Sequence, residues 1–189
     1  QKRVFETVDH GTLGLAFAYQ LAGTGAFGAV FQSRTVNHDI FVSRSIYWGT
    51  NLEGSTAAES VNALSATWYF AEGSRGGELF DNFFLVFNPT RIPAIATFTF
   101  SRADGVNITR QYPVPAQQRL TLYANQIPEL AGKDFSTTIT TTEGVVAERA
   151  MYWRLIGGTG TTWVGGTATV GARAASMGWV FAEGAAAPG

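Results

Sequence analysis

Short stretches of alternating apolar and polar residues, separated by turn signals, recur along this chain. Residues 96–101 are the clearest case, because Phe98 and Phe100 alternate with Thr97 and Thr99. Side chains of a strand point to its two faces in turn, so this pattern predicts a strand with one buried face. The same signals predict further strands at residues 68–72, 80–87, 106–112, 119–124, 135–142, 145–153 and 167–172.

Turn residues divide these predicted strands. Asp104-Gly105 is a hairpin signal, and Glu143-Gly144 is expected to turn the chain between residues 135–142 and 145–153. A helical turn is expected only at residues 127–131. So many short strands favour an all-β fold, in which antiparallel sheets pack as immunoglobulin-like β-sandwich repeats.

The same phrases occur twice in the same order. Residues 68–73 read Trp-Tyr-Phe-Ala-Glu-Gly, and residues 179–184 read Trp-Val-Phe-Ala-Glu-Gly. A repeat of about 110 residues has the size of a β-sandwich domain. We therefore predict the C-terminal part of one repeat at 1–66, a complete repeat at 67–177 and the opening strand of a further repeat at 178–189. Three further phrases match between the copies: 21–23 followed by Phe27 with 130–132 followed by Phe135, 43–48 with 148–153, and 54–57 with 165–168.

Several of these phrases together resemble the units of bacterial extracellular tandem-repeat surface proteins. In that family, units open with a WYLAEG-like strand and close with an AERAMYW-like strand. The resemblance implies an immunoglobulin-like β-sandwich in a stalk, adhesin or surface fibre, and it brings no catalytic residues. The phrases that carry it are WYFAEG (68–73), FLVFNP (84–89), DG (104–105), YPVPA (112–116) and VAERAMYW (146–153).

Composition narrows the class of protein further. The chain is 46% hydrophobic, enough for a substantial core, but only 14% charged, against about 25% in typical globular proteins. A polar surface built from hydroxyl and amide side chains favours an extracellular or cell-surface location. Lysine and arginine form no cluster, so no nucleic-acid partner is expected, and no apolar run is long enough to predict a membrane span.

The usual residues of catalysis and metal binding are scarce. The chain has no cysteine, and its two histidines, His10 and His38, fall outside the complete repeat. No serine lies in a Gly-x-Ser-x-Gly context. The stretch 104–107 is explained more simply by a hairpin turn than by a cation site. We therefore predict no catalytic, cofactor-binding or metal site and no enzymatic activity.

One modification signal stands out in the complete repeat. Asn107-Ile108-Thr109 is an N-glycosylation sequon, and it follows the predicted turn at Asp104-Gly105, where a side chain would be accessible. Asn107 is therefore a candidate glycosylation site, although chance occurrence of the sequon is the favoured interpretation.

A charged residue keeps the same register with aromatic residues in both copies. Arg149 shares a strand face with Trp153, and Arg44 shares one with Trp48. A charge on such a face is partly buried and needs a partner. We predict that Arg149 pairs with Glu72 or Glu183, and that Arg44 pairs with Glu72. The alternative is that each charged group reaches solvent at a strand end.

These features predict a non-enzymatic structural or adhesive surface protein. Unpaired strands at 1–66 and 178–189 suit self-association by strand addition into a surface filament; the alternative is a piece of a longer repeat protein. The second candidate function is a carbohydrate-binding β-sandwich module with surface glycans as partners. Exposed tryptophans on one sheet face would favour that function, and Trp163 is expected to be the most exposed of Trp48, Trp153 and Trp163.

Overall fold

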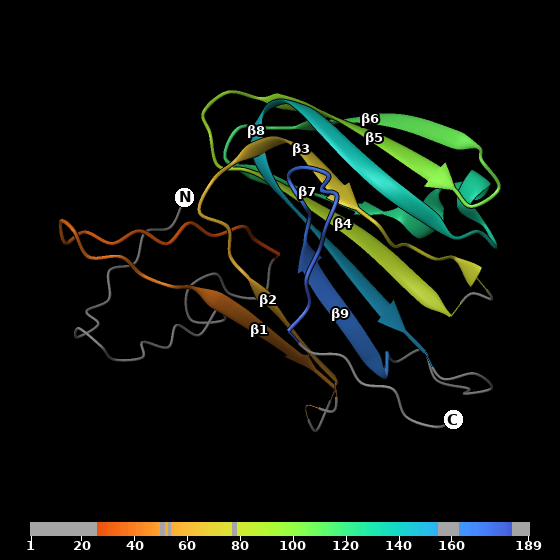
Figure 1. Ribbon diagram of the computed structural model, residues 1–189, viewed down its shortest axis with the longest axis horizontal. Helices are drawn as coiled ribbons and strands as arrows, with labels where there is room; N and C mark the ends of the chain where they lie inside the picture. Colours follow the sequence, from red (N-terminus) through yellow and green to blue (C-terminus); the bar gives the residue numbers. More distant parts are fainter. Residues whose placement is uncertain (1–25, 50–51, 53, 77–78, 155–162, 183–189) are drawn as a thin grey trace.

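A computed structural model describes residues 26–49, 52, 54–76, 79–154 and 163–182 (Figure 1). Nearly all of its regular structure is antiparallel strand, which confirms the all-β fold class. The elements are β1 (Ser43–Trp48), β2 (Gly54–Glu59), β3 (Ser65–Phe70), β4 (Phe80–Asn88), β5 (Ala94–Arg102), β6 (Asn107–Val114), β7 (Gln118–Tyr123), the short 3-10 helices η2 (Ala124–Gln126) and η3 (Pro128–Leu130), β8 (Phe135–Trp153) and β9 (Gly165–Val170).

The long strand β8 joins two sheets into one curled sandwich. Its first half pairs with β3 on one edge and β5 on the other, and β6 continues the sheet beyond β5. Its second half pairs with β4 and β9, and β7 continues that sheet beyond β4. One strand therefore belongs to both layers, and Figure 1 shows it running from the upper layer to the lower one.

The predicted turn at Glu143-Gly144 is wrong, because β8 continues as a strand through both residues. The chain changes sheet there by an irregularity in its pairing with β3. Ser65 pairs with Val145 and Thr67 with Thr140, so β8 advances by more residues than its partner. Such a bulge bends a strand without reversing it. The indole N–H of Trp68 donates to the carbonyls of Ser65 and Val145 at this bend, at 3.1 and 3.2 Å.

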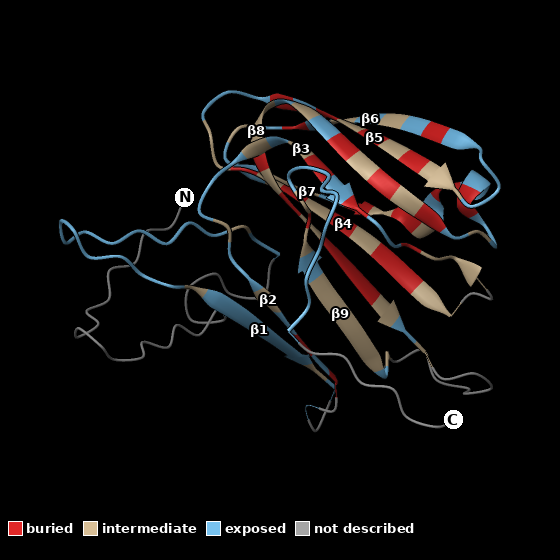
Figure 2. Cartoon of the chain, in the orientation of Figure 1, coloured by how far each residue is buried: buried red, intermediate tan, exposed pale blue. Residues whose placement is uncertain are grey.

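Aromatic side chains make up much of the buried core between the two layers. Figure 2 shows that buried positions alternate with less buried ones along strands such as β4, β5 and β8. Phe84 of β4 lies at the centre and meets Phe98, Phe100 and Phe70 edge-on, with ring centroids 5.4 to 5.9 Å apart. Trp68, Phe84, Phe98 and Phe100 are completely buried. The predicted alternation in residues 96–101 is confirmed, because both phenylalanines face this core while the threonines between them are partly exposed.

Two of the expected local features are also present. The chain turns at Asp104-Gly105, where Gly105 has a φ of 85° that favours glycine. The helical turn expected at 127–131 is η3. Asn88 closes the turn after β4, because its side-chain amide donates to the carbonyls of Ile92 and Val114 at 2.8 and 3.2 Å.

The hairpin of β1 and β2 forms a separate two-stranded sheet beside β9 (Figure 1). Trp48 pairs with Gly54 in this hairpin, and Trp153 pairs with Gly165 in the hairpin of β8 and β9. In both, the indole covers the glycine so closely that a Cβ atom would lie 2.1 or 2.2 Å from the ring. The two hairpins therefore share sequence, register and a tryptophan-on-glycine contact.

Candidate functional site

A row of aromatic side chains crosses the outer face of the sheet formed by β7, β4, β8 and β9. Tyr123 stacks on Phe83, with centroids 4.7 Å apart and planes 15° apart. Phe83 meets Trp163 edge-on, and Trp163 stacks on Tyr152 at 4.5 Å. The row ends at Trp48, which meets Tyr152 edge-on at 5.2 Å and donates its indole N–H to the Trp163 carbonyl at 3.0 Å. The β1–β2 hairpin is thus attached to the sandwich through aromatic contacts.

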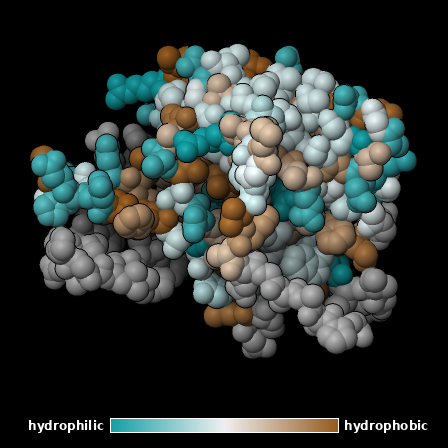
Figure 3. Space-filling model, in the orientation of Figure 1, coloured by the Kyte–Doolittle hydropathy of each residue, from teal (hydrophilic) through white to brown (hydrophobic). Residues whose placement is uncertain are grey.

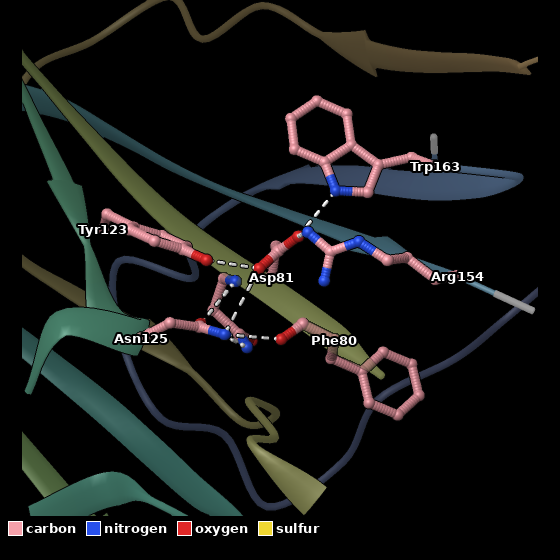
Figure 4. Close-up of polar contacts among 7 residues, drawn as sticks. Phe80, Asp81, Tyr123, Asn125, Arg154 and Trp163 are labelled. Carbon is pink, nitrogen blue, oxygen red and sulfur yellow. Dashed lines mark hydrogen bonds and ion pairs between the residues drawn. The ribbon is translucent and has the colours of Figure 1, made fainter. Parts of the chain in front are cut away.

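A buried carboxylate binds Tyr123 and Trp163, two members of this row (Figure 4). Asp81 of β4 is only 2% exposed. Its Oδ1 accepts hydrogen bonds from the Tyr123 hydroxyl and, at 3.4 Å, from Asn125. Its Oδ2 accepts from the indole N–H of Trp163 at 2.6 Å and forms an ion pair with Arg154. The four donors lie in β7, in η2, directly after β8 and before β9, so the carboxylate joins these segments to the start of β4.

The environment of Asp81 also affects the tyrosine that it binds. Burial raises the pKa of the Tyr123 hydroxyl above its ordinary value of 10.0, and the hydrogen bond to Asp81 acts in the same direction. Burial likewise raises the pKa of the Tyr152 hydroxyl. Both groups are therefore held in the protonated, neutral form, which suits packing and hydrogen-bond donation rather than proton abstraction.

A network of asparagines extends the cluster from Asp81 towards β3. The side chain of Asn125 donates to the Phe80 carbonyl at 2.7 Å and accepts from the Asn82 backbone N–H at 3.0 Å. The buried Asn82 side chain in turn donates to the Ser74 carbonyl and accepts from the Ser74 N–H. These bonds fix the segment after β3 against β4, so the whole polar centre ties strands together.

The predicted pair between Arg149 and Glu72 is present. Nη1 of Arg149 lies 3.2 Å from Oε2 of Glu72 and also donates to the Glu72 backbone carbonyl. Arg149 is buried whereas most of the Glu72 side chain is exposed. Glu183, the other candidate partner, lies outside the described residues.

The prediction for Arg44 is wrong, because its Nη1 lies 3.0 Å from Oε2 of Glu148 instead of pairing with Glu72. The physical reason is the position of its hairpin. Arg44 belongs to β1, which packs outside the sandwich. Glu148 lies on the face of β8 opposite to Arg149. Arg119 lies near this pair, and burial lowers the pKa of its guanidinium while Glu148 opposes that effect.

The other candidate residues lie apart from this cluster. Asn107 is exposed at the start of β6, so its side chain is accessible, and its glycosylation stays a prediction. His38 is exposed before β1, with Nδ1 3.0 Å from the Val36 carbonyl, whereas His10 lies outside the described residues. Asp104 binds Arg102 and Lys133, and the hydrogen bond from Arg102 lowers the pKa of the carboxyl to about 2.

Two of the shallow depressions on the surface of the described part of the chain have a defined place in the fold. One, of about 390 Å³, lies where β1, β2 and β9 meet. The other, of about 590 Å³, lies beside Glu72 and Asp134 and is lined by the serines Ser74, Ser101 and Ser136. Among the described residues, no three histidine or carboxylate side chains gather in a way that could hold a metal ion. No helix in this part of the chain is long and apolar enough to cross a membrane.

Sequence reasoning missed the Asp81 cluster and misplaced Trp163. Asp81 and Asn82 interrupt an otherwise apolar and aromatic strand, and two polar residues at that place were an available signal. Trp163 was expected to be exposed, but it is partly buried because its ring stacks on Tyr152 and its N–H reaches Asp81. The residues next to Trp163 in the sequence predict neither its contact with Tyr152 nor its hydrogen bond to Asp81.

Comparisons with known proteins inform the fold and not the chemistry. No protein-family model matches the sequence, and no curated protein matches it. A crystal structure of Thermotoga maritima 1070 is similar, with a TM-score of 0.51 and 17% identity over 59% of this chain and 96% of that chain. The Anabaena sensory rhodopsin transducer, also 17% identical, has a TM-score of 0.42 over 47% of this chain and 89% of that chain. At this identity, the likeness to the Thermotoga protein shows a shared fold alone.

Proposed function

We propose that this chain is a non-enzymatic structural or adhesive extracellular repeat protein, whose β-sandwich units join to units of their own kind. The observation that carries the proposal is the repeated hairpin. Trp48 on Gly54 and Trp153 on Gly165 are the same contact, in the same register, in two parts of one chain. Two copies of a hairpin in which a tryptophan covers a glycine are expected in a protein built from similar stacked units. A catalytic domain does not require such a duplication.

The aromatic row supports this role because it forms a joint. Trp48 belongs to the first copy of the hairpin, and its contacts Tyr152 and Trp163 belong to the unit that follows. The ion pair of Arg44 with Glu148 crosses the same boundary. Buried aromatic contacts with a charged pair beside them are typical of specific protein interfaces.

The polar centre supports a structural role as well. The Asp81 carboxylate accepts bonds from four donors, including a cation, so its charge is compensated where it is buried. Such a network rigidifies the strands that contribute to it. It lies under aromatic rings and outside both surface depressions, which offers a substrate no route to the carboxylate through either of them.

An extracellular or cell-surface location fits the surface chemistry. The chain has few charges for its size. Figure 3 shows the visible face as a mosaic of hydrophobic and hydrophilic residues. Ser55 of β2 and Thr169 of β9 are examples of exposed hydroxyl residues.

Glycan binding is the second candidate function, and the described tryptophans favour it less. Trp48 and Trp163 contact Tyr152 from the outer face, which occupies ring faces that a sugar would need. Trp153 is 37% exposed but points to the other face of β8. These three rings therefore form no open platform on one sheet face.

Light scattering of the full chain over a wide concentration range tests the proposal. We expect the average mass to rise with concentration, because units that join to their own kind associate by mass action. A monodisperse monomer at the highest concentration, together with binding of the chain to an immobilised glycan, would favour the second function instead.

A further inference from the structure

Residues 177–181 carry apolar side chains that contact little of the described structure. Val180 is 95% exposed, Phe181 is 87% exposed and Trp179 is 63% exposed. The segment belongs to no strand. Three consecutive large apolar residues at these exposures form a continuous surface of the kind that marks an interaction site.

The same phrase has a defined place in β3. Trp68 and Phe70, which correspond to Trp179 and Phe181, are buried in the core. β3 reaches that position by antiparallel pairing with the first half of β8, with Trp68 opposite Ile139 and Phe70 opposite Thr137. The phrase therefore folds as a strand when it lies beside a strand like the beginning of β8.

A segment like the beginning of β8 exists elsewhere in the chain without a partner strand among the described residues. Residues 27–31 read Phe-Gly-Ala-Val-Phe and correspond to Phe135–Ile139, because each follows a Leu-Ala-Gly phrase and precedes a matching hairpin. Phe27, Val30 and Phe31 are exposed, and residues 26–42 form no strand. Residues 179–181 and residues 27–31 therefore both lack a partner strand in the described part of the chain.

We propose that residues 179–181 of one molecule add as an antiparallel strand to residues 27–31 of a second copy of this chain. The register follows from β3 and β8: Trp179 lies opposite Phe31, Val180 opposite Val30 and Phe181 opposite Ala29. Strand addition supplies backbone hydrogen bonds, and the alternating side chains supply specificity. The inference rests on the proposed function, since it names the partner and the contact through which units join.

Engineered cysteines test this register directly, because the chain has none of its own. The single variants Val30→Cys and Val180→Cys are mixed and oxidised. Opposed residues in antiparallel strands have Cα atoms about 4.5 to 5.5 Å apart, within the span of a disulfide. We expect a cross-linked heterodimer to form at least about tenfold faster than in a mixture of Val106→Cys with Val180→Cys. Val106 is exposed in a hairpin on another part of the surface.

Equal rates for the two mixtures would overturn the inference. So would a double variant, Val30→Cys with Val180→Cys, that cross-links only within one molecule and runs as a monomer. Heterodimers in the first mixture and slow reaction in the control support it.

A second pair of variants separates pairing from folding. Trp179→Ser with Phe181→Ser removes two side chains that are exposed in the single chain, so circular dichroism and the unfolding midpoint should not change. We expect the association constant to fall at least about tenfold. The matched control, Ile92→Ser with Ile95→Ser, removes two exposed apolar side chains near the start of β5 and should associate as the parent does.

The outcomes separate this inference from the proposed function. Chains that associate without a Val30–Val180 cross-link, and without loss on changing Trp179 and Phe181, would retain the structural function and remove the strand pairing. Chains that remain monomeric at every concentration would remove both.

Discussion

At the scale of single residues, Asp81 organises the polar centre of the sandwich. Its four donors come from β7, η2, the end of β8 and the chain before β9. A buried carboxylate is costly unless it is paired, and here the pairing also gathers elements that are distant in sequence. The residue therefore acts on stability and on the position of Trp163 at once.

Replacement of Asp81 by alanine should destabilise the fold by about 2–4 kcal/mol, because the Tyr123 hydroxyl, the Trp163 N–H and the Arg154 guanidinium lose their acceptor. Urea unfolding followed by tryptophan fluorescence measures the change. Asp39→Asn, at an exposed position before β1, is the control. An equal unfolding free energy for both variants would show that the cluster contributes no stability.

Tyr123 makes the stability of the fold depend on pH, and the sign of this dependence follows from its pKa. Its folded-state pKa is raised above 10.0, so the fold favours the neutral phenol. This contribution is complete below about pH 10 and is lost as the pH rises through the folded-state pKa. The stability advantage of the parent over Tyr123→Phe should therefore shrink between about pH 9 and pH 12. An advantage that stays constant over this range in urea titrations would contradict the assigned hydrogen bond.

At the scale of elements, the two hairpins depend on glycines that lie under tryptophans. A Cβ atom at position 165 would lie 2.2 Å from the Trp153 ring, so the indole or the strand must move. Gly54 stands in the same relation to Trp48. Glycine is required at these two positions because the tryptophan ring lies so close to the backbone, and not because of the backbone conformation.

Replacement of Gly165 by alanine should destabilise the sandwich by about 1–3 kcal/mol through overpacking against Trp153. Gly178→Ala is the matched control, because a Cβ atom there meets nothing within 4 Å. Thermal unfolding of both variants measures the difference. If Gly165→Ala unfolds at the same temperature as Gly178→Ala, the indole is free to move and the glycine is not required.

Several elements could be predicted from the sequence because their signals are local. Phe98 and Phe100 alternate with threonines, and this alone predicted the buried face of β5. The hairpin turn followed from Asp104-Gly105 in the same way. Glu143-Gly144 carries an equally local turn signal, yet the strand passes through it, because pairing with β3 and packing around Trp68 hold the backbone extended. Tertiary contacts overrode the local preference.

The candidate site was less predictable for the same reason. Arg149 and Glu72 could be paired in advance because both keep a register with aromatic residues in a repeated phrase. The partners of Asp81 follow no common period, since they come together only after the strands pack. Arg44 was assigned to the wrong carboxylate because the sequence does not reveal which face of the sandwich its hairpin covers.

At the scale of the whole molecule, the sandwich of β3 to β9 carries a second hairpin on its outer face and an exposed apolar phrase at 177–181. The first feature joins the β1–β2 hairpin to the sandwich through Trp48 and Arg44. The second is an exposed apolar segment that belongs to no strand in the described part of the chain. Both fit a protein whose units are completed by neighbours of the same kind.

Electron micrographs of the protein at high concentration would show whether its molecules join end to end. We expect elongated particles of uniform width, built by repeated end-to-end contact of one molecule with the next, because a heterologous contact that does not close extends without limit. Separate compact particles of single-chain size at every concentration would contradict it.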